Sequence, residues 1–187
     1  EPVTEDAPYK PSSPYSASKA SSDHLVKSYY RTFGLPALIS NCSNNYGPYQ
    51  HKEKLIPLII SKCLKNEKIP IFGDGRQIRD WIYVEDHVDA LINCIHNSKI
   101  GETYNIGAKS QIDNISLTIK ICNYLDKLKP LSNNKSYCQL IKKVKDRPGH
   151  DRCYGINNFK AINKLNWEPK IDLEIGIKKT INWYLEN

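Results

Sequence analysis

The sequence predicts an α/β fold from three observations. Helical and strand-like segments alternate along the 187 residues, which is typical of α/β chains. The first helical segment, from Pro14 to about Thr32, is followed by Gly34 and Pro36, a common way to end a helix. The short apolar segment 37–42 is typical of a covered parallel strand, and the polar loop 43–50 leaves it where open α/β sheets bind ligands.

The remaining elements follow from the same criteria. We expect helices over 55–65, 85–97, 116–128 (with Ser116 as N-cap), 158–165 and 172–185, and strands over 69–72, 78–84, 102–106 and 141–144. Polar loops are expected over 129–135 and 146–152. In the first helix, we expect the aromatic side that carries Tyr29, Tyr30 and Phe33 to be buried.

Composition argues against several classes of partner. The formal net charge is +7, but the lysines are scattered and lack the aromatic–basic interleaving of RNA-binding strands, so no nucleic acid partner is expected. No apolar run approaches the roughly 20 residues that span a bilayer, so no membrane association is expected. The six cysteines form no CxxC motif and most have apolar neighbours, which favours buried free thiols in a reducing cytoplasm over disulfides or a metal site.

The segment around Pro14 carries the strongest chemical signal. Ser13 is a suitable N-cap and Pro14 suits the first helical position, so Tyr15 and Lys19 lie one turn apart on the same helix face. An ammonium one turn away favours the phenolate over the phenol, whose ordinary pKa is about 10. Tyr15 is therefore a candidate general base for a substrate hydroxyl, although Tyr-x-x-x-Lys by itself also occurs in exposed amphipathic helices.

The sequence lacks the glycine-rich loop of a dinucleotide-binding chain, since no GxGxxG motif follows any predicted strand. It also contains no methionine and begins in a polar, proline-rich stretch. The missing methionine and the polar start lead us to expect an incomplete chain. Either the protein has no dinucleotide site, or the part that carries its glycine-rich loop lies upstream of Glu1.

Five segments, in this order, resemble the dTDP-glucose 4,6-dehydratase family of extended short-chain dehydrogenases/reductases. They are YSASKAS (15–21), NCSNNYGPY (41–49), EKLIP (53–57), QIRDWIYVEDH (77–87) and DRPGHD (146–151). The resemblance implies the C-terminal part of a Rossmann-like NAD-binding fold plus a smaller α/β nucleotide-sugar-binding domain. It places the end of the Rossmann domain in 1–45 and mainly the substrate domain in 46–187, with 78–97 packing back on the Rossmann part.

The resemblance also implies the chemistry. NAD and dTDP-glucose are the expected cofactor and substrate, and Tyr15 deprotonates the sugar 4-hydroxyl with help from Lys19. Tyr15, Lys19 and Asn45 would contact the cofactor. The expected substrate-binding residues are Asn44, Lys54, Leu55, Pro70, Ile71, Phe72, Arg79, Asn114, Asp146, Arg147, Pro148, Gly149 and His150. A homodimer would form through the helix that carries Tyr15 and Lys19, which would then expose an apolar stripe in this chain.

The family's Asp-Glu pair for dehydration, preceded by threonine, has no match, since Glu5-Asp6 stands in a different context. We therefore expect this chain alone to neither bind NAD tightly nor turn over substrate. Two alternative functions are not excluded. The chain could belong to another nucleotide-sugar enzyme of the fold, a UDP-sugar epimerase or decarboxylase, or it could be a non-catalytic nucleotide-sugar-binding remnant.

Individual residues also have plain alternatives to these roles. Arg79 could pair with Asp80 on the surface, and Arg147 could join its flanking aspartates in a loop network. Asn44 and Asn45 could be turn residues, and Phe72 could belong to the core.

Overall fold

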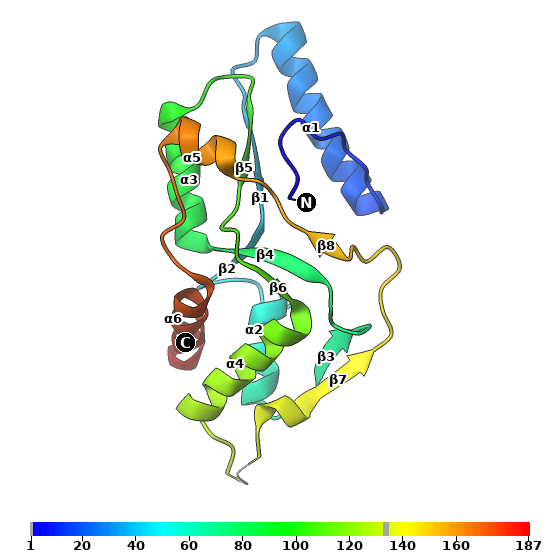
Figure 1. The fold of residues 1–187 in the computed structure, drawn as a ribbon, viewed down its shortest axis with the longest axis vertical. Helices are drawn as coiled ribbons and strands as arrows, with labels where there is room; N and C mark the ends of the chain where they lie inside the picture. The colour runs from blue at the N-terminus through cyan, green and yellow to red at the C-terminus, as the bar shows by residue number, and fades with distance from the viewer. Residues whose placement is uncertain (1, 133–134) are drawn as a thin grey trace.

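The computed structural model describes residues 2–132 and 135–187 and confirms the α/β class. Figure 1 shows an upper lobe with α1, β1, β5, α3 and α5, and a lower lobe with α2, α4, β3, β7 and α6. The elements are α1 (Pro14–Phe33), β1 (Ile39–Cys42), β2 (Asn44–Tyr46), α2 (Leu55–Leu64), β3 (Ile69–Phe72), β4 (Ile78–Tyr83), α3 (Val84–Asn97), β5 (Thr103–Ile106), β6 (Gln111–Asp113), α4 (Asn114–Leu128), η1 (Tyr137–Leu140), β7 (Ile141–Val144), β8 (Cys153–Tyr154), α5 (Phe159–Leu165) and α6 (Leu173–Glu186).

The strands form three small sheets that are mostly parallel. β1 pairs with β5, and β3 pairs with β7, both in parallel. β4 lies between β2, which is parallel to it, and β6, which is antiparallel, and its first residues also pair with β8. β4 therefore ties β2, which carries Asn44 and Asn45, to β8, which follows the 146–152 loop.

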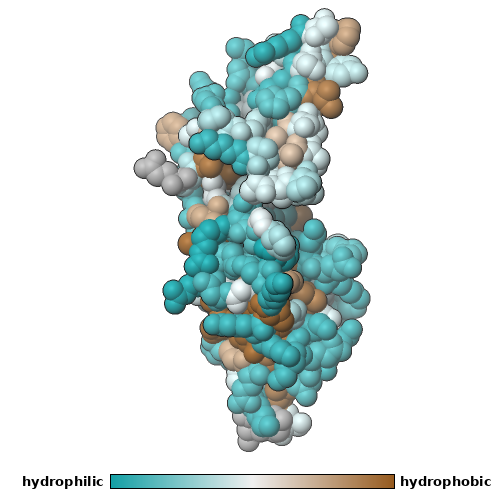
Figure 2. Space-filling model, turned by 90° about the vertical axis from the view of Figure 1, so that its right-hand side faces the viewer, coloured by the Kyte–Doolittle hydropathy of each residue, from teal (hydrophilic) through white to brown (hydrophobic). Residues whose placement is uncertain are grey.

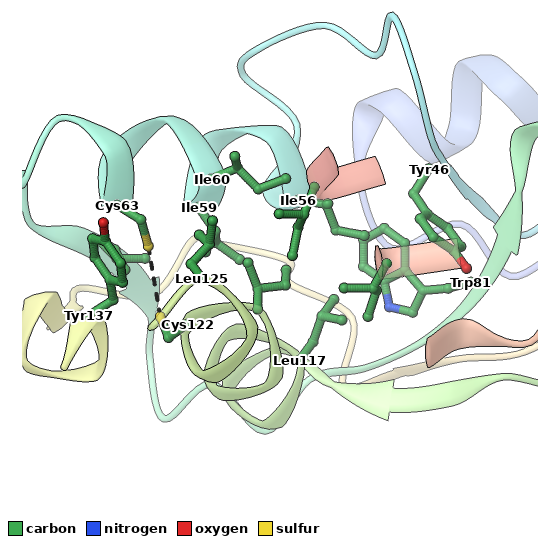
Figure 3. Close-up of a cluster of buried hydrophobic side chains, with 14 of the residues drawn as sticks. Tyr46, Ile56, Ile59, Ile60, Cys63, Trp81, Leu117, Cys122, Leu125 and Tyr137 are labelled. Carbon is green, nitrogen blue, oxygen red and sulfur yellow. Dashed lines mark hydrogen bonds between the residues drawn. The ribbon is translucent and has the colours of Figure 1, made fainter. Parts of the chain in front are cut away.

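Two hydrophobic cores hold the lobes together. The lower core packs α2 against α4 and includes Ile59, Leu117 and Leu125, all fully buried (Figure 3). The upper core joins β5, α3 and α5 through Tyr104, Cys94 and Leu165. The lower core takes Trp81 and Tyr83 of β4 and the upper core takes Ile82 between them, because successive strand residues face opposite sides.

Most predicted elements are confirmed within a residue or two, but some predictions are wrong. The α4 N-cap is Asp113 rather than Ser116: its carboxylate accepts the Ser116 N–H at 2.8 Å, so the helix begins at Asn114. Residues 44–46 form β2 within a predicted loop, because the β4 edge supplies hydrogen-bond partners. The short polar strands β6 and β8 were not predicted, and residues 133–134 of the predicted loop 129–135 lie outside the described residues.

The first helix is more exposed than predicted. The prediction that Tyr29, Tyr30 and Phe33 are buried is wrong: their exposed fractions are 52%, 38% and 73%, and α1 contains no buried residue. The reason is that, within the described residues, no other helix or strand packs extensively against α1. The expected exposed apolar stripe is thus present. Figure 2 shows apolar side chains on an otherwise hydrophilic surface at the top of the molecule, where α1 ends.

All six cysteines are free thiols, as expected. Buried thiols were expected, and Cys63, Cys94 and Cys122 are buried. Cys153 is exposed instead, because the two-residue strand β8 lies at a sheet edge. The described part of the chain contains no helix that is both long enough and apolar enough to cross a membrane.

Candidate active site

The Tyr15 helix begins as predicted. Ser13 caps it in a reciprocal box, in which Ser16 N–H donates to Ser13 Oγ at 3.2 Å and Ser13 N–H donates to Ser16 Oγ at 2.9 Å. Pro14 occupies the first turn. Tyr15 is 76% exposed, so its phenol is open to a substrate.

The charge of Lys19 acts on the carboxyl end of β1. Burial raises the pKa of the Cys42 thiol there, the Asn45 amide opposes the rise, and the Lys19 ammonium opposes it further. Lys19 also stands one helical turn after Tyr15 in α1.

Tyr154 in β8 links Tyr15 to Arg79. Burial is the main cause that raises the pKa of Tyr154, Tyr15 adds to the rise, and Arg79 opposes it. Arg79 lies opposite Tyr154 in the parallel pairing of β4 with β8. Ser12, two residues before Pro14, also donates from Oγ to Asp151 Oδ1 at 2.8 Å, which joins the start of α1 to the 146–152 loop.

Arg79 is held by main-chain carbonyls. Its Nη1 donates to Ile78 O at 2.7 Å and its Nη2 to Asp151 O at 2.8 Å. Burial lowers its pKa, and the neighbouring Arg147 lowers it further. Asp80 is fully buried and accepts the Ser110 N–H, so the alternative of a surface Arg79–Asp80 pair does not hold.

Arg147 and Phe72 meet at the end of β3. The Arg147 guanidinium carbon lies 5.3 Å from the Phe72 ring centre, in cation–π range. Phe72 is 39% exposed, so it is not a core residue. An exposed aromatic ring next to a guanidinium group is suited to a nucleotide, whose base stacks and whose diphosphate pairs with arginine.

Asn44 and Asn45 lie in β2 rather than in a turn. The Asn45 amide is tightly held: its Nδ2 donates to Cys42 Sγ at 3.3 Å and to Ser43 O at 3.2 Å. Its Oδ1 accepts from His87 Nδ1 at 2.8 Å. Burial lowers the pKa of His87, which favours the neutral ring with its proton on Nδ1.

The other predicted residues are placed less directly. Lys54 is exposed at the N-terminus of α2, while Leu55 and Pro70 are half-buried. Ile71 is 2% exposed and belongs to the lower core. Asn114 begins α4, and its Oδ1 is buried without a partner among the described residues.

The loop that contains Asp146 to His150 closes one side of the site. Asp146 and His150 are paired, with Oδ1 and Nδ1 2.7 Å apart, while Pro148 is exposed. Gly149 has a φ of +66°, which glycine adopts without strain, and a Cβ there would lie 3.3 Å from Ser12 O. The loop is thus packed against the segment that leads into α1.

The structure brings Tyr15, Arg79 and Arg147 to one side of the molecule around β8, where α1 begins (Figure 1). Sequence reasoning missed Tyr154, His87 and Gln77. Two of these, Gln77 and His87, lie within a motif quoted for the resemblance. In the described ranges, no three His, Cys, Asp or Glu side chains are arranged to hold a metal ion.

The solved structures that this chain resembles define its class, the extended short-chain dehydrogenases/reductases of the Rossmann type. The family model described as GDP-mannose 4,6 dehydratase matches residues 1–180. The chain therefore belongs to this family.

The chain is 54% identical over 184 residues to dTDP-glucose 4,6-dehydratase from Escherichia coli, which covers 98% of this chain and 50% of the relative. One similar solved structure is DesIV, a dTDP-glucose 4,6-dehydratase from Streptomyces venezuelae with NAD and dTDP bound. It has a TM-score of 0.89 and 38% sequence identity, and the match covers 100% of this chain and 55% of DesIV. UDP-glucuronic acid 4-epimerase from Bacillus cereus, with UDP-glucuronic acid and NAD, has a TM-score of 0.86 at 28% identity, covering 100% and 57%. The chain thus spans about half the length of these relatives.

Proposed function

We propose that this chain carries the general base and the nucleotide-sugar site of a dTDP-glucose 4,6-dehydratase, an NAD-dependent hydro-lyase that forms dTDP-4-keto-6-deoxyglucose. The observation that supports the proposal is that Asp151, in the loop that contains Arg147, is hydrogen-bonded both to Arg79 and to Ser12, three residues before Tyr15. The 54% identity to the Escherichia coli enzyme supports the choice of substrate.

Tyr15 accepts the proton of the sugar 4-hydroxyl. Its phenol is exposed at the start of a capped helix, and Lys19 lies one turn further on. A tyrosine in this position can take the proton of a bound hydroxyl as a general base.

The residues around the end of β1 fit the nicotinamide side of NAD. Lys19 and the fixed Asn45 amide lie there, next to the exposed Tyr15. When bound, NAD accepts the C4 hydride and later returns it to C6. No residue of this chain matches the glycine-rich loop for the cofactor diphosphate, so we expect weak NAD binding by this chain alone.

Arg79 and Arg147 bind the substrate diphosphate, and Phe72 flanks the thymine. Two guanidinium groups side by side repel each other, and a diphosphate between them removes that repulsion. The loss of water across C5 and C6 needs an acid/base pair that this chain does not supply. Glu5 is unsuited to that role because its Oε1 accepts the Asn105 N–H at 2.8 Å.

Calorimetric binding of dTDP to this chain tests the substrate site. We expect Arg79→Ala and Arg147→Ala each to weaken binding by about 10- to 100-fold, the equivalent of a charge-assisted hydrogen bond. Arg31→Ala, in the last turn of α1, is the matched control and should leave binding unchanged. Equal binding by all four proteins would contradict the proposed diphosphate site.

The activity is tested by adding the N-terminal half of the Escherichia coli relative, the part that precedes its match to this chain. We expect the mixture to convert dTDP-glucose to a product lighter by one water, detected by mass spectrometry. Tyr15→Phe should lower the rate by about 10²- to 10⁴-fold, as for loss of a general base. If this chain alone formed the product, it would have to supply the acid/base pair for loss of water, and our assignment of that pair to another part of the protein would be wrong.

A UDP-sugar epimerase or decarboxylase is the second candidate, favoured by the structural match to the Bacillus cereus epimerase. UDP-glucose and dTDP-glucose offered side by side to the same mixture separate the two, since only the proposed function predicts dehydration of the dTDP sugar. A non-catalytic binding module predicts dTDP binding by this chain without product from the mixture.

We also propose that the chain divides into the end of a Rossmann domain, 1–45, and mainly a substrate domain, 46–187, with 78–97 packed back on the first. We further propose that the protein is cytoplasmic and forms a homodimer through α1. The exposed Tyr29, Phe33 and Leu25 support the dimer. Sedimentation of the reconstituted mixture tests it: Leu25→Glu with Phe33→Glu should halve the assembly mass.

A further inference from the structure

Gln77 connects three segments of the site. It lies between β3 and β4, two residues before Arg79, and its exposed fraction is 2%. Its side-chain Nε2 donates to Asp146 Oδ2 at 3.0 Å, and its main-chain oxygen accepts the Asn114 N–H at 3.2 Å. A single buried residue therefore links the start of β4, the start of α4 and the 146–152 loop.

The Asp146 carboxylate is already occupied by donors from the protein. Its Oδ1 accepts from His150 Nδ1 at 2.7 Å and from the Arg147 N–H at 2.8 Å, while its Oδ2 accepts from Gln77. His150 chiefly lowers the pKa of Asp146, so the carboxyl is ionised at neutral pH. An anion with its oxygens bonded in this way is poorly suited to touch a diphosphate, which it would repel.

The place of this loop decides where Arg147 lies. Arg147 follows Asp146 directly and lies over Phe72, close enough to Arg79 to lower its pKa. Arg79 in turn holds the other end of the loop through Asp151 O. The Ile78 N–H also donates to Arg152 O at 2.9 Å, so both of these bonds hold the Asp151–Arg152 end of the loop. The Gln77 amide holds the opposite end, at Asp146, next to Arg147.

We propose that Gln77 is a positioning residue for the diphosphate end of the site, and that Asp146 acts with it as the anchor of the loop rather than as a ligand. The Gln77–Asp146 hydrogen bond sets the spacing of Arg79 and Arg147. This inference rests on the proposed function, and it changes the role predicted for Asp146.

The test exchanges the two partners. Gln77→Glu places a carboxylate against Asp146 Oδ2, and we expect about tenfold weaker binding of dTDP. Asp146→Asn alone costs less, because the Gln77 amide can rotate and accept through Oε1, which has no partner among the described residues. The double variant restores a donor–acceptor pair with the roles reversed, so its affinity should exceed that of Gln77→Glu.

Gln139→Glu, at an exposed glutamine, controls for the added charge and should bind as the unmodified chain does.

Limited trypsin digestion gives a readout that needs no ligand. Lys145 and Arg152 flank the loop and are exposed. Gln77→Glu should speed cleavage at both sites several-fold, and the double variant should slow it again, while the melting temperatures confirm that each variant is folded.

Two results would overturn the inference: unchanged dTDP affinity and cleavage in Gln77→Glu, or a double variant no better than Gln77→Glu by either measure. If the unmodified chain bound no dTDP, the proposed substrate site would fail. Digestion would then decide by itself whether Gln77 anchors the loop.

Discussion

A buried contact between Tyr46 and Gly176 makes a sharp prediction about stability. Tyr46 ends β2, directly after the two asparagines of the site, and Gly176 lies in α6. A Cβ at Gly176 would collide with the Tyr46 hydroxyl and lie 2.8 Å from Cζ and 3.0 Å from Cε2. Tyr46 is 1% exposed and packs edge-on against Trp81 and Tyr83, so its ring has no free direction in which to move.

Gly176→Ala therefore changes the free energy of unfolding in two opposite ways. Alanine in a helix is favoured over glycine by about 1 kcal/mol. Overpacking a filled core costs about 1–3 kcal/mol, and this site belongs near the upper end because both partners are buried. We expect Gly176→Ala to lower the free energy of unfolding by about 2 kcal/mol.

Tyr46→Phe supplies the internal control. The Tyr46 hydroxyl is buried without a partner in the described part of the chain, so its removal should be neutral or stabilising by up to about 1 kcal/mol. Because the same atom is the nearest to the new methyl group, Tyr46→Phe should restore at least half of the stability that Gly176→Ala removes.

Urea denaturation of the four proteins, followed by tryptophan fluorescence, measures the cycle. The midpoint should fall in Gly176→Ala with little change in slope, and should recover in the double variant. The reasoning is refuted if Gly176→Ala is as stable as the unmodified chain, or if the two changes are simply additive.

Two further predictions concern the surface of the site. Arg152 lowers the pKa of Asp74 to about 2, below its unfolded value of about 3.9. Asp74 therefore contributes stability above about pH 4 that is lost as the pH falls toward 2, and the melting-temperature gap between the unmodified chain and Asp74→Asn should shrink over that range. A thiol reagent should label exposed Cys153 first and reach Cys63, Cys94 and Cys122 only with urea; rapid labelling of Cys122 in native buffer would contradict the packing of α2 on α4.

Local rules were sufficient for most elements of this fold. Ser13, Pro14 and Gly34 each act within one turn of a helix end, so the bounds of α1 follow from neighbours in sequence. β6 and β8 could not be predicted in this way, since β4 supplies their hydrogen-bond partners from a distant part of the chain.

In the candidate site, too, some features depend on neighbours in sequence and others depend on the folded chain. The types and spacing of Tyr15, Lys19, Arg79 and Arg147 can be read from the chain itself, because chemistry at a helix turn or in a motif depends on nearby residues. The contacts of Asp151 with Arg79 and Ser12, the contact of Gln77 with Asp146, and the exposure of Phe33 depend on segments that meet only after folding. Burial and long-range hydrogen bonds are properties of the packed chain, so only the tertiary structure decided which of these side chains are exposed and which are held by other residues.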